Sequence, residues 1–233
     1  MSINPGKLAQ ISRRQVAVGL ALVALAAACT PAAPQTPMSG GQATGQMPSA
    51  QVTSSTKAAA LRSSLNTLLQ EHVYLAASAT GAALGGREAE FKAAADALDA
   101  NSVDLSKAIG SVYGAEAERT FLTLWRSHIN MFVDYTVGVA TNDRAKQDKA
   151  VNDLVGYTQS FGSFINSATG LPKETVAELV KTHVLTLKDV VDAQAAKDPS
   201  KAYAALRRAA DHMKMIADPL AEAIVKKFPE KFS

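Results

Sequence analysis

Four histidines are the residues of this sequence with the clearest capacity for metal chemistry. They are His72, His128, His183 and His212, and each falls on a segment whose apolar residues recur at three- and four-residue steps. Each imidazole can therefore point inward if the apolar faces form the core. We expect these rings to converge on a metal ion, with two to four imidazoles at one site; the sequence leaves open which histidines share a metal and whether there are two sites. The alternative is that each is an isolated core histidine with its own hydrogen bond.

Neutral imidazole binds copper, zinc, iron and nickel, so the neighbouring residues must indicate which metal is meant. The sequence has no Glu-x-x-His pair, no Cys-x-x-Cys-His and no His-Glu-x-x-His, which are typical of di-iron, haem and zinc-protease sites. Met215 follows His212 by three residues on the same helical face, and Met131 stands likewise after His128. Because thioethers suit Cu(I), the pattern favours copper over zinc, although histidines alone do not decide between them.

Two arginines near the histidines could attract a small anion to such a metal. Arg208 lies one helical turn before His212, and Arg126 lies two residues before His128. We take both as candidates for anion steering, with ordinary surface charge as the alternative. No other catalytic group is predicted.

The helical period that places these residues runs through residues 57–233. It predicts six helices joined by short connections and therefore an all-α antiparallel bundle. No stretch alternates with a period of two, so no strand is expected. The expected helices cover 57–84, 88–112, a segment through 121–135 ending near 142, a segment through 151–165 ending at 170, 172–190 and 199–229. Pro219 is expected to kink the last of them.

The sequence also carries a weak internal repeat. A shift of 111 residues lays His72 on His183, and the same shift lays Asn101 on His212. Two helical hairpins would then face each other across a pseudo-twofold axis. Asn101 becomes a further polar candidate near the site, either as a ligand or as a supporting group.

The first 56 residues are typical of an export leader followed by a tether. Residues 1–28 form a signal peptide, ending in an apolar run that is too short to cross a membrane. Leu25-Ala26-Ala27-Ala28-Cys29 resembles a bacterial lipobox, which implies a lipid on Cys29, and residues 29–56 read as a flexible linker. The alternative is an ordinary signal peptide, and Arg13-Arg14 leaves both the general and the twin-arginine export routes open.

Removing the leader also removes the apparent positive charge of the chain. The sequence has 24 basic and 21 acidic residues, and three of the basic ones, with none of the acidic ones, lie in the leader. The mature domain is formally neutral, which argues against binding to nucleic acid. With Cys29 lipidated, it also has no thiol for a disulfide or an iron–sulfur cluster.

The motifs around the histidines resemble those of helical copper-binding envelope lipoproteins. These motifs read Leu-Leu-Gln-Glu-His72, Leu-Trp-Arg-Ser-His128, Leu-Val-Lys-Thr-His183 and Asp-His212-Met-Lys-Met. The resemblance implies a copper cofactor held by the four histidines, with an S-layer or other envelope complex as partner. It also implies copper-only superoxide dismutase activity with superoxide as substrate. A non-catalytic copper carrier or store, and a structural adaptor of an envelope complex, are the alternatives.

Overall fold

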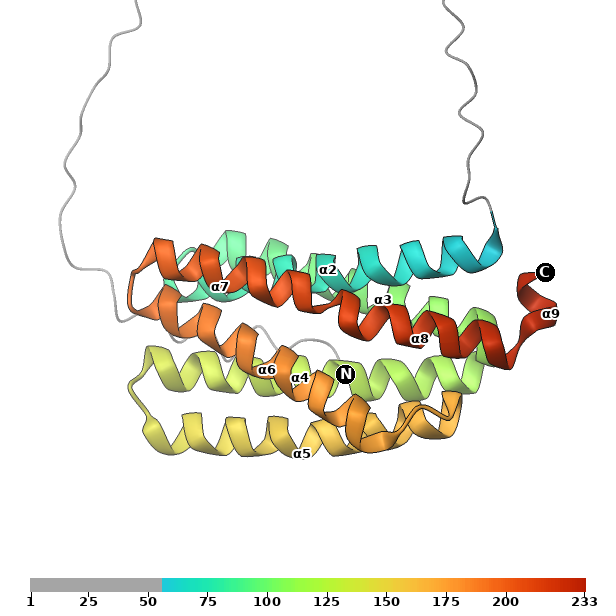
Figure 1. The fold of residues 1–233 in the computed structure, drawn as a ribbon. Coiled ribbons are helices and arrows are strands. Elements are labelled where there is room, and N and C mark those ends of the chain that lie inside the picture. Colours follow the sequence, from blue (N-terminus) through green and yellow to red (C-terminus); the bar gives the residue numbers. More distant parts are fainter. Residues whose placement is uncertain (1–55) are drawn as a thin grey trace, which may run out of the picture.

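The computed structural model describes residues 56–233, and every regular element in that part of the chain is a helix (Figure 1). The prediction of an all-helical bundle is confirmed. The expected signal peptide, Cys29 and the linker as far as residue 55 lie outside the described residues. The helices are α2 (Lys57–Leu84), α3 (Glu88–Tyr113), α4 (Ala115–Ala140), α5 (Arg144–Thr169), α6 (Lys173–Ala195), α7 (Pro199–His212), α8 (Lys214–Lys227) and α9 (Pro229–Phe232).

The last expected helix is divided into α7 and α8, which continue one another along one line (Figure 1). The division lies at Met213, where the amide donates to the carbonyl of Ala210, three residues back. It therefore lies ahead of Pro219, where the kink was expected. Pro219 itself lies inside α8, where it removes the amide that would bond the carbonyl four residues before it but does not end the helix. The final proline, Pro229, begins the short helix α9.

The chain is built from three helical hairpins, α2–α3, α4–α5 and α6–α7, whose turns have the same backbone form. Each turn has three residues, and its middle residue has a positive φ: 68° at Gly86, 53° at Asn142 and 56° at Lys197. In each turn the amide of the third residue donates to a carbonyl in the last turn of the preceding helix, over 2.8–3.0 Å. This is the hydrogen-bond pattern of a left-handed helix C-terminus.

The histidines follow the same repeat. His128 lies 56 residues after His72. The next interval is one residue shorter, both from His128 to His183 and from Asn142 to Lys197 in the turns. On the second helix of each hairpin the equivalent positions hold Asn101, Tyr157 and His212. Asn101 donates to the carbonyl of Leu68 over 3.0 Å, and His212 contacts the carbonyl of Leu179 at 2.8 Å. Leu68 and Leu179 are themselves at equivalent positions. The expected correspondence of two hairpins is thus part of a threefold one.

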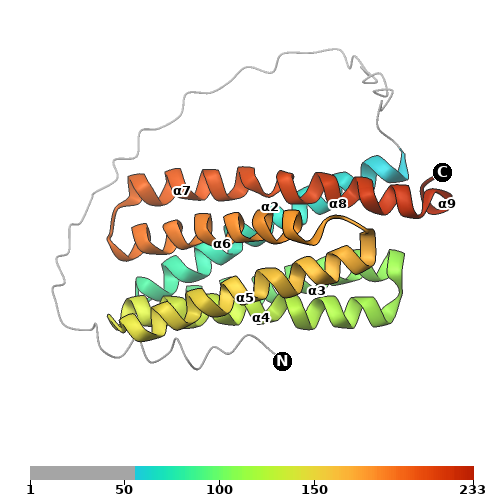
Figure 2. The same cartoon turned by 60° about the horizontal axis from the view of Figure 1, so that its bottom comes forward.

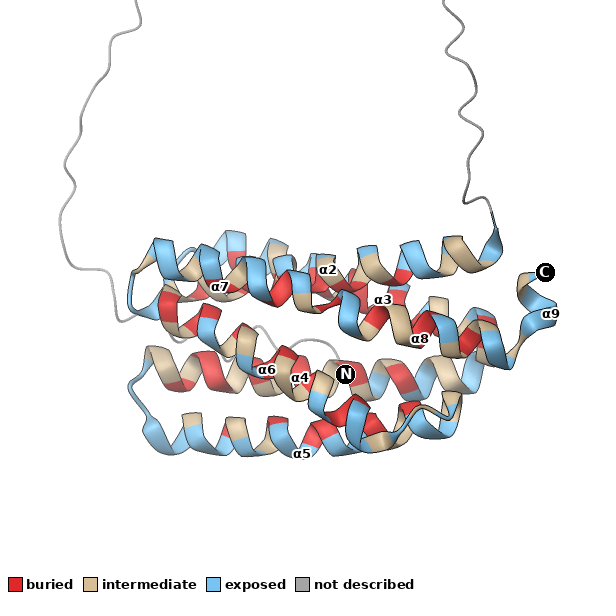
Figure 3. Ribbon diagram, in the orientation of Figure 1, coloured by how far each residue is buried: buried red, intermediate tan, exposed pale blue. Residues whose placement is uncertain are grey.

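The three hairpins close into a ring. Helix α3 packs against α4, α5 against α6, and α7 and α8 against α2, while the first helices α2, α4 and α6 also contact one another inside. Figure 2 shows α6 beside α7, and Figure 3 shows the buried residues on the faces that the helices turn to each other. The first helices of the hairpins therefore surround the centre of the molecule.

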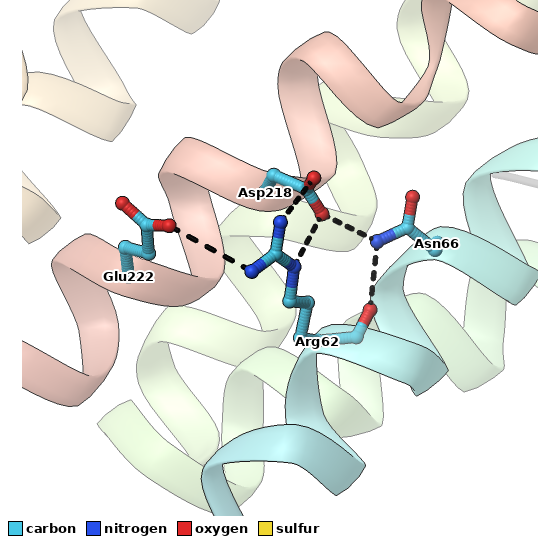
Figure 4. A network of polar contacts seen from close by, with 4 residues as sticks. All are labelled: Arg62, Asn66, Asp218 and Glu222. Atoms are coloured by element: carbon cyan, nitrogen blue, oxygen red, sulfur yellow. Dashed lines mark hydrogen bonds and ion pairs between the residues drawn. The ribbon is translucent and has the colours of Figure 1, made fainter.

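A polar cluster joins the first and last long helices where the ring closes (Figure 4). The Arg62 guanidinium on α2 donates to both carboxylate oxygens of Asp218 on α8, over 2.8 and 2.5 Å. Asn66 donates to the same carboxylate over 2.8 Å, and the Arg62 bond holds the pKa of Asp218 below its ordinary value. Because these side chains are half exposed, the cluster orients α8 on α2 more than it stabilises the fold.

The positive φ of Gly86 predicts opposite effects for two glycine-to-alanine changes. Neither Gly86 nor Gly156, inside α5, has a heavy atom within 4 Å of the position an alanine Cβ would take. Gly86→Ala should lower the free energy of unfolding by about 1 kcal/mol, because an L-residue is strained at positive φ. Gly156→Ala should raise it by about 0.5–1 kcal/mol, because glycine weakens a helix interior. Urea unfolding of both variants measures this, and equal signs would contradict the assignment of the turn.

Within the described residues, no helix combines the length and the apolar character that a membrane span requires.

Candidate metal centre

Three of the four histidines meet at the centre of the ring. His72, His128 and His183 come from the inner helices α2, α4 and α6, and their residues are 1%, 1% and 3% exposed. One ring nitrogen of each lies within 4.8 Å of one ring nitrogen of the other two. The Nε2 atoms of His72 and His128 are 3.4 Å apart. We call these three residues the histidine triad.

The triad fits the spacing that a shared metal ion requires. Imidazole nitrogens bind such ions at about 2.0–2.1 Å, so two of them at a tetrahedral angle lie about 3.3–3.4 Å apart. The pair formed by His72 and His128 already has this separation. The nitrogen of His183 lies within 4.8 Å of the other two, so only a small displacement of its ring would be needed to complete the site.

Four of the six ring nitrogens of the triad lack a hydrogen-bond partner in the described structure, and the other two, the Nε2 atoms of His72 and His128, face each other. Both ring nitrogens of His183 are buried without a hydrogen bond, and so are the Nδ1 atoms of His72 and His128. A buried polar atom without a partner costs about 1–3 kcal/mol, and most native structures avoid it. A bound ion would satisfy one nitrogen of each ring. This is the opposite of the alternative in which each histidine has its own hydrogen bond.

Aromatic rings hold the triad from two sides. The Trp125 ring centroid lies 4.9 Å from that of His72 and 4.7 Å from that of His128. The Tyr157 ring, on α5, lies 4.9 Å from His128. These rings restrict how the imidazoles of His72 and His128 can turn. Neither Trp125 nor Tyr157 was predicted from the sequence, because an aromatic residue in an apolar face is usually core packing.

The buried setting keeps the triad in the form that binds metal. Burial, followed by the charge of His183, lowers the pKa of His128 to about 3. Burial, followed by the charge of His212, lowers the pKa of His183 to about 4. Burial also holds the pKa of His72 well below its ordinary value. All three imidazoles are therefore neutral at pH 7, and each offers a lone pair.

An apolar cavity of about 30 Å³ lies beside the triad and touches His72 and His128. Its wall comes from α2, α3, α4 and α6. The other lining residues are small or apolar apart from two threonines: Ala76, Ala79, Thr80, Phe91, Ala95, Leu98, Ile129, Phe132, Val133, Thr136 and Leu187. The cavity therefore adjoins two of the three side chains that could hold an ion.

We compared the chain with protein-family models, curated proteins and solved structures, and none of them matches it. Its function must therefore be inferred from the geometry of the histidine triad and its surroundings.

The fourth histidine and Met215 lie outside the triad. The Nε2 atom of His212 contacts the carbonyl of Leu179 at 2.8 Å, and Met215 is 52% exposed. His212 does not belong to the group of ligand atoms that converge, and the exposure of Met215 places it away from the buried triad. The reason is that α7 and α8 form the outer layer, so their inner faces meet the backbone of the inner helices. Met213, 1% exposed, fills the core in place of Met215.

The other predicted polar residues also have partners away from the cavity. Arg126 donates to both carboxylate oxygens of Asp99 at 2.7 Å, and Arg208 is 61% exposed and lies 3.8 Å from Asp189. Asn101 donates to the Glu71 carboxylate at 2.8 Å as well as to Leu68. None of the three lines the cavity beside the triad.

Proposed function

We propose that this domain binds one copper ion through His72, His128 and His183. The observation that carries the proposal is the meeting of three neutral, buried imidazoles, with four of their six ring nitrogens unpaired. A single structural histidine is common in a core, but four unpaired imidazole nitrogens at one point would be costly without a ligand. Metal binding accounts for that cost.

The charge of the surroundings supports copper in its cuprous state. The triad ligands are neutral, and no carboxylate belongs to the converging group in the described part of the chain. The cost of burying an ion rises with the square of its charge, so a divalent ion costs about four times as much as a monovalent one. We propose Cu(I) on this ground, with no need for the thioether of Met215 that the sequence suggested. Three neutral imidazoles also hold Zn²⁺ in catalytic sites, so Zn²⁺ is the competing ion.

Superoxide disproportionation is the second candidate function. The resemblance of the histidine motifs suggests it, although the uncharged wall of the cavity does not favour an anion such as superoxide. A copper ion exchanges single electrons with small molecules that reach it, and a catalyst must leave such access. The cavity beside His72 and His128 would supply it. A carrier or store needs no such open side, and an adaptor protein needs no metal.

We propose further that the domain works outside the cytoplasm, tethered to the cell envelope through a lipid on Cys29. The basis is the leader at residues 1–28 and the lipobox-like sequence before Cys29. Association with an S-layer or other envelope complex is part of the same proposal and rests on the resemblance of the histidine motifs.

The test of metal binding is an anaerobic titration of the purified protein with Cu(I) against a chromophoric chelator, and with Zn²⁺ in parallel. We expect one Cu(I) per chain and weaker zinc binding. At free copper a thousandfold above the dissociation constant, the loaded protein should gain about 4 kcal/mol. For a domain of this size the unfolding temperature should then rise by about 8–16 °C. No bound copper after loading would support the structural adaptor.

The catalytic candidate is tested on the same sample by superoxide decay in pulse radiolysis. Disproportionation that scales with bound copper and disappears on copper removal supports a dismutase. Stoichiometric copper without turnover supports a carrier or store.

A further inference from the structure

We infer that the cavity beside the histidine triad is a binding site for a small neutral diatomic molecule, such as carbon monoxide, nitric oxide or dioxygen, as an exogenous ligand of the bound metal. This inference rests on the proposed metal site, which it deepens by naming the class of ligand.

The size of the cavity sets the first limit. A cavity needs a volume of roughly 10–15 Å³ to hold one water molecule, where the volume is the space open to the centre of a water-sized sphere. The volume of about 30 Å³ therefore admits one diatomic molecule and excludes larger organic substrates. The molecule would lie against His72 and His128, which both line the cavity and belong to the triad.

The chemistry of the wall sets the second limit. Alanine methyl groups from two helices, Phe91 and Phe132 make up much of the surface. The polar lining groups besides the histidines are the hydroxyls of Thr80 and Thr136, and both already donate hydrogen bonds. Thr80 donates to Gln194 at 2.8 Å and Thr136 to the carbonyl of Phe132 at 2.8 Å. Such a cavity holds water poorly and favours apolar molecules.

The absence of charge from the wall sets the third limit. No lysine, arginine, aspartate or glutamate is among the described residues that line the cavity. An anion that entered would lose its hydration and gain no ionic partner other than the metal itself. Arg126, the nearest basic residue to His128 in the sequence, is held by Asp99. The cavity therefore selects neutral molecules over anions such as azide and cyanide.

The decisive experiment measures ligand binding to the Cu(I)-loaded full domain by infrared spectroscopy of bound carbon monoxide. We expect a C–O stretching band in the natural protein and no change on adding azide. Ala95→Leu, which fills the cavity from α3, should abolish the band while one copper per chain remains. The matched control is Ala205→Leu, at a similarly buried alanine of α7 that does not line the cavity. It should keep the band.

A second measurement tests the cavity without any metal. Methyl resonances of metal-free protein are recorded under dissolved dioxygen, whose paramagnetism speeds the relaxation of nearby nuclei. Ala76, Ala95 and Ile129 should relax faster, whereas Ala217, buried elsewhere, should not. This arm needs no variant, so it decides the question even if Ala95→Leu fails to fold.

The two measurements separate the failure of this inference from the failure of the metal site. Selective relaxation without any copper binding would refute the proposed function and leave a gas-binding cavity. Copper binding without selective relaxation, or a carbon monoxide band unchanged in Ala95→Leu, would overturn the inference. Azide or cyanide bound as readily as carbon monoxide would overturn the selection of neutral ligands.

Discussion

Replacing His128 by alanine should weaken Cu(I) binding at least about a hundredfold, while His212→Ala should leave it nearly unchanged. Loss of a residue that only orients a metal ligand already costs 10–100-fold in affinity, and His128 supplies one of three converging nitrogens. His212 instead contacts the carbonyl of Leu179. The two changes remove the same side chain, so they form a matched pair.

The measurement is a competition titration with a chelator at pH 7 on both variants, with circular dichroism as a check of folding. His128→Ala also removes an unpaired buried nitrogen. The metal-free variant can therefore stay folded, and lost affinity would report on the ligand. Equal losses in the two variants, or loss in His212→Ala alone, would refute the triad as the site.

Acid should destabilise the metal-free protein well above the pH at which carboxylates titrate. The pKa of a histidine is about 6.5 in the unfolded chain, whereas it is about 3 for His128 and about 4 for His183 in the fold. Below pH 6.5 the unfolded state therefore binds more protons than the folded state. The free energy of unfolding then decreases as the pH is lowered, until the pH reaches the pKa of the histidine in the folded state. Between pH 6.5 and 4.5 the loss should be on the order of 2 kcal/mol for each of these histidines.

Urea unfolding at a series of pH values measures this dependence. The double change of His128 and His183 to leucine should reduce it to the contribution of His72, and His212→Leu should leave most of it in place. The copper-loaded protein should lose less stability at low pH than the metal-free protein. The ligands are neutral in the folded state, so protons compete little with the metal. A metal-free protein as stable at pH 4.5 as at pH 6.5 would show that the three rings do not stay buried and neutral.

The elements of this fold follow from local chemistry, and so they could be predicted from the sequence. Helix ends fall at residues such as Gly114 and Gly170, both with positive φ, and at the Asp198 cap before Pro199. The apolar period also placed His72, His128 and His183 on inward faces. These are properties of one helix at a time, for which spacing is sufficient.

The composition of the proposed metal site depends on which helices are inner, and spacing within a helix does not contain that information. His212 and Met215 were assigned to the site because their helix has an apolar face, but that face packs in the outer layer. The middle hairpin was missed as a repeat because Tyr157 stands where the others have Asn101 and His212. Its turn and its histidine identify it once coordinates are compared.

The equivalence of the three hairpins has a consequence for how such a site can arise. One short helix–turn–helix peptide with a single inward imidazole, assembled as three identical copies, would bring three such groups to its symmetry axis. A trimer of separate peptides could therefore bind a metal ion before the three copies were fused into one polypeptide. Once the copies are fused, the sequence of each hairpin can change independently. The equivalent positions on the second helices, Asn101, Tyr157 and His212, illustrate such changes.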